Sequence, residues 1–457
     1  IENLYIDKSI VLTGNYMFDG NPYSIETTII DGSNSGDPLF SSAVFIGPPE
    51  DGEFTSQPEL TGFTIRNGGG TTITDPDGFT QIAGGGVFVY NCNPNLHDNY
   101  FIENGLNIYT GDLIDEGGAV YISNGIFITF GEGANFQPYT GNYNPIRDEI
   151  NLSGSRFSGN TAHIGNSIVT RGYEGTINTS NCYFDVFSHD NQSVSNYWVS
   201  GDEEVEYDFS GSSGEHNAII TADIHINEDS GNNETGDGSN ESPFQDIAHA
   251  LGLAYGTEEN PVTIHLDNVR NRRNRPREMQ YPLQMVDHVN LSGRGDRATE
   301  LDADDQSRIL LFDNTKGVLI DSLILKHGRD ENYVGGAVYI NRSNPTFRSV
   351  KFRENDGVRG GALYIKSSEP VFQDVEITDN LGNRGGGIYS KESILTFTNV
   401  ELSDNEVIST RDEIENSYGG ALFVDNSCLF LDNVQIYDNS VLEDNAAGGA
   451  IYGTMPE

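Results

Sequence analysis

Short runs of alternating apolar and polar residues recur in the C-terminal part of this chain. Written as Phe-x-x-Val-x-Phe-x-x-Asn, the copies are Phe347/Val350/Phe352/Asn355, Phe372/Val375/Ile377/Asn380, Phe397/Val400/Leu402/Asn405 and Leu431/Val434/Ile436/Asn439. Apolar residues two positions apart follow the period of a β-strand, and Gly, Asn and Asp separate the runs. The pattern therefore predicts two or three short strands in each repeat.

Each copy follows a pair of glycines. The pairs begin at Gly335, Gly360, Gly385, Gly419 and Gly448, at intervals of 25, 25, 34 and 29 residues, and earlier copies begin at Gly84 and Gly117. Such a period is typical of stacked supersecondary units, because one turn of this length cannot bury its own apolar face. Stacking residue i over residue i+25, with strands about 4.8 Å apart, closes a continuous core. We therefore predict an all-β protein, a right-handed parallel β-helix with coils of about 25 residues.

The recurrent asparagine of the repeat has a structural interpretation. Asn355, Asn380, Asn405 and Asn439 would form a ladder at one corner. Asparagine tolerates the left-handed backbone of a tight bend, and stacked amides can hydrogen-bond along the axis. The glycine pairs would be corner residues that need positive φ or close backbone approach. We assign neither set to chemistry.

One segment interrupts the strand pattern. Residues 228–242 form a polar, glycine-rich acidic loop, and residues 243–251 predict a capping helix with Ser242 as its N-cap and Pro243 in its first turn. The stretch after the helix resembles the opening of the chain, which indicates a tandem duplication. We predict a first β-helix module at 1–205 that lacks its N-terminal part, a linker with the acidic loop at 206–242, and a second module at 243–457.

Composition limits the possible partners. Asp and Glu number 69 against 25 Lys and Arg, so the formal charge is −44. This charge repels nucleic acid and anionic membrane surfaces, and it favours calcium, cationic groups or neutral sugars. No apolar run is long enough for a transmembrane helix. The chain starts at Ile1 in mid-pattern, so we expect a mature fragment of a longer protein, and we expect Cys92, Cys182 and Cys428 to be buried.

Two sets of motifs carry a family resemblance. The GGA[ILV] and FxxN elements, the latter intact at 101–104, 157–160 and 352–355, resemble the repeats of the polymorphic outer-membrane proteins. The Gly-Asp-Gly-Ser loop and Ser-Pro-Phe-Gln-Asp-Ile helix start at 236–247 resemble the opening of secreted right-handed β-helix proteins of the pectate-lyase-like superfamily. The resemblance implies an extracellular or cell-surface β-helix associated with adhesion. It does not select an activity, because this scaffold hosts lyases, hydrolases and adhesins.

A lyase on such a scaffold would need a basic residue to abstract a proton beside a uronate carboxylate and a cation to hold the resulting charge. Arg359 and Arg384 are 25 residues apart, as are Lys366 and Lys391, so each pair should stack on adjacent coils. Lys366-Ser367-Ser368 resembles the Lys-Ser-Ser motif of the alginate lyase and chondroitinase B type, which makes Lys366, Arg359 and Arg384 the catalytic candidates. Solvated basic residues are the favoured alternative.

An aromatic position of the repeat suits binding. Tyr339, Tyr364, Tyr389, Phe423 and Tyr452 each follow an aliphatic residue that should face inward. By alternation their rings would face outward as a ladder on which sugar rings could lie. Rings that stack inside the core are the alternative, and the sequence leaves both open.

Metal and charge candidates lie outside the repeat. Asp229, Glu234 and Asp237 offer oxygen ligands of the kind that calcium uses, although the spacing does not fit an EF-hand and a solvated loop is the alternative. A basic run, Arg270/Arg272/Arg273/Arg275/Arg277, could dock an acidic polymer or the acidic flank of another copy of this chain, and a solvated loop is the favoured alternative. Lys326 and His327 at a strand end could form an acid/base pair, against which stands a solvated histidine.

These features support three hypotheses of function. We favour a non-enzymatic adhesion, structural or polysaccharide-binding module, with a surface glycan as its partner. The alternatives are a lyase or hydrolase acting on acidic polysaccharide, and a subunit that self-associates through an open β-helix end.

Overall fold

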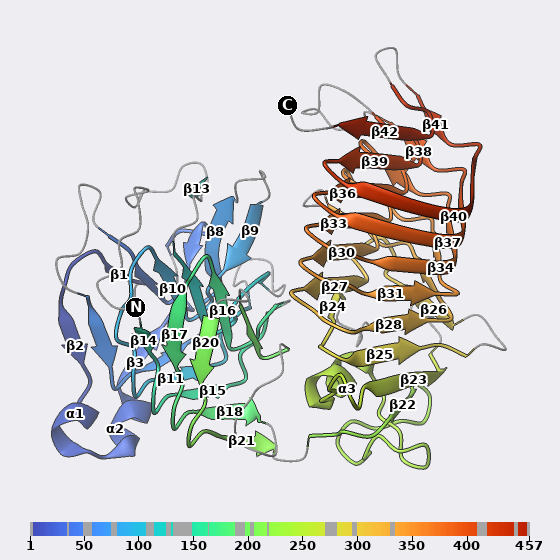
Figure 1. The fold of residues 1–457 in the computed structure, drawn as a ribbon. Helices are drawn as coiled ribbons and strands as arrows, with labels where there is room; N and C mark the ends of the chain where they lie inside the picture. The colour runs from blue at the N-terminus through green and yellow to red at the C-terminus, as the bar shows by residue number, and fades with distance from the viewer. Residues whose placement is uncertain are drawn as a thin grey trace. The chain divides into compact units, whose positions relative to one another are not determined.

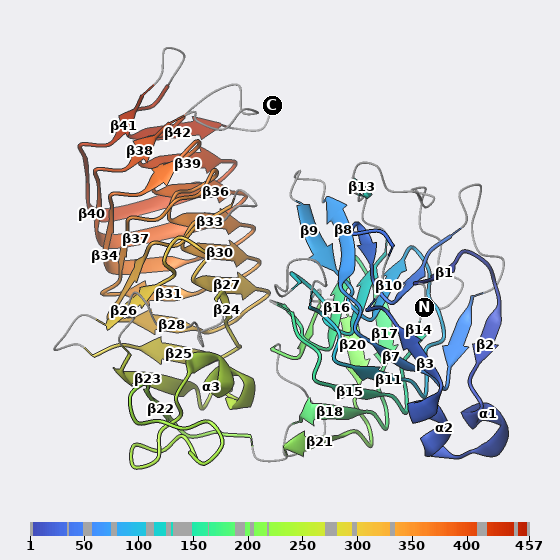
Figure 2. The ribbon, with the colours of Figure 1, turned by 180° about the vertical axis from the view of Figure 1, so that it is seen from behind.

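The structure, a computed structural model, describes residues 3–33, 36–48, 57–74, 80–106, 114–124, 129–130, 149–162, 164–187, 197–201, 205–216, 219–269, 281–294, 299–329, 334–408, 418–442 and 447–454. The chain divides into two units, Ile1–Ile219 and Ile220–Glu457. Within each unit, the short strands of successive coils lie next to one another (Figure 1), and the view from behind shows the other walls of each stack (Figure 2).

The first unit has two main parallel sheets and smaller additions. One sheet consists of β1 (Leu4–Ile6), β5 (Val44–Ile46), β10 (Val87–Tyr90), β12 (Val120–Ser123), β16 (Ile168–Arg171) and β19 (Val199–Ser200). The other consists of β3 (Ile29–Asp31), β7 (Thr64–Arg66), β11 (Tyr100–Ile102), β15 (Arg156–Ser158), β18 (Tyr183–Val186) and β21 (Ser213–His216). The remaining parallel strands are β2 (Val11–Thr13), β6 (Glu59–Thr61), β14 (Glu149–Asn151), β17 (Gly175–Asn178) and β20 (Val205–Asp208).

Insertions decorate this unit. Helices α1 (Tyr16–Asp19) and α2 (Pro22–Thr27) lie between β2 and β3 in the sequence. A small antiparallel sheet consists of β4 (Phe40–Ser41), β8 (Gly70–Thr74), β9 (Thr80–Ala83) and β13 (Thr129–Phe130).

The second unit is the more regular. One parallel sheet consists of β24 (Leu283–Gln284), β27 (Leu310–Asp313), β30 (Val338–Asn341), β33 (Leu363–Lys366), β36 (Ile388–Lys391), β39 (Leu422–Asp425) and β42 (Ile451–Thr454). The second sheet consists of β22 (Ile224–Asn227), β23 (Val262–Asn268), β25 (Val289–Ser292), β26 (Thr299–Asp302), β28 (Leu319–Asp321), β29 (Leu323–Lys326), β31 (Thr346–Arg348), β32 (Lys351–Arg353), β34 (Val371–Thr378), β37 (Ile394–Ser403) and β40 (Cys428–Tyr437). The third consists of β35 (Leu381–Gly382), β38 (Glu406–Val407) and β41 (Ser440–Val441).

The strand register confirms the predicted period. Phe347 pairs with Phe372, Phe372 with Phe397 and Phe397 with Leu431, in parallel. Val338, Leu363, Ile388 and Leu422 form an equivalent row in the other wall, and their side chains are buried. Each coil thus covers the apolar face of the one before it, and the fold is the predicted parallel β-helix.

The two glycines of each pair meet different requirements. Gly335 and Gly360, the first members of their pairs, have φ of 58° and 75°, in the left-handed region. Gly336, a second member, lies so close to the next coil that a Cβ there would stand 2.3 Å from the carbonyl oxygen of Gly361. Positive φ and close approach were the two expected reasons, and both apply.

The asparagine ladder forms as expected, but the asparagines themselves do not adopt the left-handed backbone conformation that the sequence predicted for them. Each Oδ1 accepts hydrogen bonds from the backbone N and the Nδ2 of the asparagine one coil earlier, at 2.9–3.2 Å from Asn355 to Asn439. The positive φ belongs to the residue before each asparagine, for example 55° at Glu354 and 57° at Asp379. The asparagine turns inward to bond the amides, so the preceding, exposed residue makes the bend.

The capping helix starts later than predicted. Helix α3 spans Ile247–Leu253, and its N-cap is Asp246, whose side chain accepts a hydrogen bond from the backbone N of His249, rather than Ser242. Phe244 forms a parallel bridge with Ile226 of β22, so the chain around Pro243 is extended and cannot be the first turn. The stretch predicted as linker, 206–242, contains β21, β22 and most of β20, which pair with neighbouring coils.

Burial follows the strand pattern in the inner coils and departs from it on β40. Cys92 and Cys182 are buried as expected, but Cys428 is exposed on β40. On the same strand Phe430 and Leu431 are also exposed, although Phe397, which pairs with Leu431, is buried.

Replacing Asn380 by alanine should destabilise the second unit. The side chain is buried and its Oδ1 is the acceptor for two donors of Asn355, so both donors would lose their partner. We expect a loss of about 2 kcal/mol or more in the free energy of unfolding, measured by urea denaturation. Gln373→Ala, an exposed position on β34 in the same coil, should change it by less than about 0.5 kcal/mol. Equal effects of the two substitutions would contradict a stabilising role for the ladder.

Candidate functional sites

The aromatic residues predicted to bind sugars form one continuous stack. The ring centroids of Tyr339 and Tyr364 are 5.5 Å apart, those of Tyr364 and Tyr389 5.3 Å, and those of Tyr389 and Phe423 4.9 Å, with interplanar angles of 5–9°. Tyr452 continues the stack at 5.5 Å from Phe423. The aliphatic residues before the first four rings are buried in the core, so the strand alternation places these rings on the opposite side of the strands.

The stack does not offer an open platform. Each inner ring has a neighbour on both faces, and Tyr364, Tyr389 and Phe423 are only 0, 5 and 4% exposed. At the ends, the guanidinium of Arg308 lies 5.1 Å from the Tyr339 ring centroid and Tyr418 stacks on Tyr452 at 4.2 Å. A sugar that stacks on an aromatic side chain needs an accessible ring face. Carbohydrate binding by these five residues therefore stays a prediction, without a ring face to support it.

The first unit contains a second ring stack, which the repeat pattern did not single out. Tyr5, Phe45, Phe88 and Tyr121 pair in register on β1, β5, β10 and β12, with centroids 5.0–5.5 Å apart. The signal was present at Phe88 and Tyr121, which follow Gly-Val and Ala-Val as the rings of the second unit do. The stack is thus a shared structural element of both units.

The candidate catalytic cations stack as their spacing predicts. Arg359 bridges to Arg384, and Lys366 pairs with Lys391. Arg359 precedes β33 whereas Lys366 ends it, so the arginines and lysines lie toward opposite ends of the strands, with the ring stack between them. Burial raises the pKa of Tyr389, and the positive charges of Arg359, Arg384 and Lys391 oppose this rise. The catalytic role of these cations remains a prediction.

A denser group of charges surrounds His327 at the end of β29. Its Nδ1 lies 2.9 Å from Asp302 Oδ1 and its Nε2 lies 2.8 Å from Glu354 Oε2. The adjacent Lys326 Nζ contacts Glu300 Oε2 at 2.8 Å and Asp302 Oδ2 at 3.6 Å. The sequence pointed to Lys326 and His327 but not to these carboxylates, because they lie one coil away.

The geometry fixes the protonation state of His327. An ionised carboxylate only accepts hydrogen bonds, so both ring nitrogens must donate, and the ring is an imidazolium. Burial alone would lower the pKa of His327, but its hydrogen bonds to Asp302 and Glu354 outweigh burial and raise it. The positive charge balances the carboxylates, and this group is a closed network of ion pairs.

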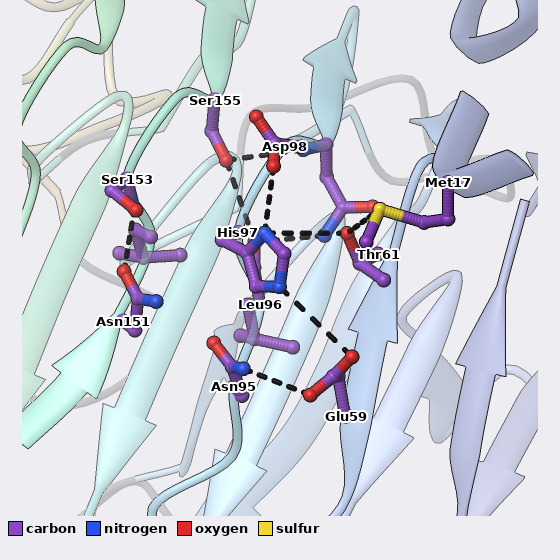
Figure 3. A network of polar contacts seen from close by, with 12 residues as sticks. Met17, Glu59, Thr61, Asn95, Leu96, His97, Asp98, Asn151, Ser153 and Ser155 are labelled. Carbon is purple, nitrogen blue, oxygen red and sulfur yellow. Dashed lines mark hydrogen bonds and ion pairs between the residues drawn. The ribbon is translucent and has the colours of Figure 1, made fainter. Parts of the chain in front are cut away.

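A related network lies in the first unit around His97 (Figure 3). His97 Nδ1 lies 2.7 Å from Asp98 Oδ2, and Nε2 lies 3.9 Å from Glu59 Oε1. The hydrogen bond to Asp98 raises the pKa of His97 against the opposing effect of burial. Asn95 Nδ2 donates to the other oxygen of Glu59 at 3.0 Å, so this carboxylate is held between two partners.

Comparison with known proteins agrees with the fold in part of the chain and leaves the activity open. Residues 299–456 match the family model described as a right handed beta helix region. The chain folds as a right-handed parallel β-helix. No curated protein and no solved structure matches it.

The acidic loop of this β-helix does not gather its candidate ligands. Asp229, Glu234 and Asp237 are exposed, and the described residues contain no group of three or more His, Cys, Asp or Glu side chains arranged to hold a metal ion. The Asp237 carboxylate accepts the backbone N of Ser239, and hydrogen bonds with Ser239 lower its pKa. Calcium binding here stays a prediction. The basic run Arg270/Arg272/Arg273/Arg275/Arg277 lies outside the described residues.

Membrane insertion by a helix finds no support in the described ranges. None of the helices there is both long enough and apolar enough to cross a bilayer.

The His327 network should make stability depend on pH. A raised folded-state pKa means that its contribution is complete below the ordinary value of about 6.5, while the carboxylates are ionised, and is lost as pH rises through the raised pKa. His327→Asn, which suits the φ of 48°, should cost about 1 kcal/mol at pH 6 and less at pH 9 in urea denaturation.

His288→Asn is the matched control for this prediction. His288 also has positive φ, 56°, and makes no side-chain hydrogen bond within the described part of the chain. Its replacement measures the cost of losing an imidazole at positive φ without a hydrogen-bonded carboxylate, and the effect of His327→Asn is compared with it. A cost of His327→Asn that grows with pH would contradict the imidazolium assignment.

Proposed function

We propose that this protein is a non-enzymatic structural and adhesion module of a secreted or cell-surface protein. In this role the β-helix provides a rigid rod whose outer surface, rather than a cleft, meets its partner. The resemblance of the GGA[ILV] and FxxN repeats to those of the polymorphic outer-membrane proteins supports both the role and the location.

One observation supports the proposal most strongly: the recurrent aromatic, asparagine and charged side chains make their contacts with the adjacent coil. Ring faces contact ring faces, amides bond amides, and Lys351 bonds Glu376 on the adjacent strand. His327, a candidate acid/base group, is held at both nitrogens by carboxylates. A general acid or base needs an atom from which it can exchange a proton with substrate. Because these side chains already contact other residues of the protein, the arrangement favours a structural role over a catalytic one.

A lyase or binding site for acidic polysaccharide is the second candidate. It is favoured by the stacked pairs Arg359/Arg384 and Lys366/Lys391, which concentrate positive charge on one wall of an acidic rod. A uronic-acid polymer along this wall would meet cations at intervals of one coil, about 4.8 Å.

Self-association is the third candidate. Its support is the exposure of Phe430, Leu431 and Tyr437 on β40, since exposed apolar side chains beside a strand edge favour contact with another chain. Sedimentation velocity across a concentration series would detect it, and Leu431→Lys should reduce it.

Turnover of acidic polysaccharides decides between the first two candidates. The full chain is incubated with a panel of uronic-acid polymers, and the unsaturated product is followed by its ultraviolet absorbance. We expect no product. Product formation that disappears in Lys366→Ala and persists in Lys351→Ala, a lysine of the other sheet, would overturn the non-enzymatic proposal and establish the lyase.

A further inference from the structure

Two histidines lie side by side on the first strands of the second unit. β22 and β23 pair in parallel, with Ile224 opposite Ile264, His225 opposite His265 and Ile226 opposite Leu266. The four aliphatic side chains are buried in the core, so alternation places both imidazoles on the outer face. Their ring centroids are 4.9 Å apart and their planes differ by 25°.

Each imidazole faces one carboxylate. His225 Nδ1 lies 2.6 Å from Asp267 Oδ2, and His265 Nε2 lies 3.4 Å from Asp223 Oδ2. Asp223 is itself anchored, since its Oδ1 accepts the backbone N of Thr263 at 2.9 Å. Among the described residues, neither ring makes a hydrogen bond through its second nitrogen. The side chains of His225 and His265 are 25 and 35% exposed, so solutes can reach them.

The hydrogen bonds to Asp267 and Asp223 are of the kind that orients metal-binding histidines. A ligating imidazole uses one nitrogen for the metal and donates its other N–H to a carboxylate or carbonyl, which orients the ring. Stacked imidazoles direct their free nitrogens in parallel, so both rings must turn toward a shared ion. Neighbouring strands already hold the two side chains on adjacent coils. The two carboxylates also supply the charge that balances a divalent cation.

We propose that His225 and His265 form a binding site for a divalent transition-metal ion of the zinc, nickel or copper type, with Asp223 and Asp267 as orienting residues. Imidazole nitrogen suits these ions, whereas calcium and magnesium prefer oxygen. Because no third side chain is arranged around one point in the described residues, water completes the coordination and the ion exchanges readily.

The site lies apart from the calcium candidates but next to their loop. The carbonyl of Gly238 accepts the backbone N of His225 at 2.8 Å, and the backbone N of Asn227 donates to Phe244 O at 2.9 Å. The loop therefore flanks β22 on one side and β23 flanks it on the other. A bound ion would clamp β22 to β23 and stabilise the start of the second unit.

Thermal unfolding of the full chain with and without added metal tests the proposal. Zn²⁺ or Ni²⁺ should raise the midpoint of the unfolding transition that reports the second unit, and the rise should grow with metal concentration. Ca²⁺ and Mg²⁺ at the same concentrations should not reproduce it. With Cu²⁺, electron paramagnetic resonance should show coordination by two imidazole nitrogens.

Variants assign the effect to the site. His225→Gln and His265→Gln should each abolish the metal-induced shift, and Asp223→Asn with Asp267→Asn should weaken binding by roughly tenfold or more. His97→Gln removes a histidine of the first unit with a similar carboxylate partner, and it should leave the shift intact. A shift that survives both histidine substitutions, an equal shift with Ca²⁺, or no shift with any transition metal would overturn the proposal.

Discussion

The vertical superposition of one coil on the next is the constraint on which the rest of this structure depends. Parallel strands leave about 4.8 Å between equivalent residues, so every position must tolerate a copy of itself directly above and below. Gly336 illustrates the demand, because a Cβ there would stand 2.3 Å from the next carbonyl oxygen. Other residues tolerate an identical neighbour on the next coil because their side chains can contact or hydrogen-bond an identical side chain. Planar rings stack face to face, and the amide of asparagine both donates and accepts.

This constraint explains which contacts could be predicted from the sequence. Because register follows from spacing alone, the intervals between glycine pairs predicted the pairings of Phe347, Phe372 and Phe397. The same spacing predicted that Arg359 would lie over Arg384. The start of α3 was not predictable in this way, since Pro243 and Ser242 are good helix-start residues that a strand bridge at Phe244 overrides. Local propensity and tertiary pairing favoured opposite conformations there, and pairing prevailed.

The candidate sites were less predictable than the fold for a related reason. A repeat consensus reveals contacts between like residues, whereas His327 contacts Asp302 and Glu354, unlike residues that lie 25 and 27 positions away in the two adjacent coils. The partners of His225 and His265 are separated from them by 42 residues in each case, because an irregular loop and a helix intervene. The 25-residue period does not connect residues that are 42 positions apart. For the ring stack the reverse holds. The spacing predicted which rings would stack, but it could not predict that the rings would be buried, because burial depends on residues outside the repeat position.

The same constraint indicates where binding can evolve on such a rod. In the regular coils, a side chain on the outer wall already has its neighbours above and below, and a ligand must compete with them. The imidazoles of His225 and His265 contact each other too, yet their outer nitrogens are not consumed by that contact, because stacking engages the ring faces and leaves the ring edges. Phenyl rings in the same geometry would have only carbon at their edges. Two stacked histidines thus resemble the other side-chain ladders but can still bind an ion through a ring nitrogen. The pair lies before the glycine repeats of the second unit begin.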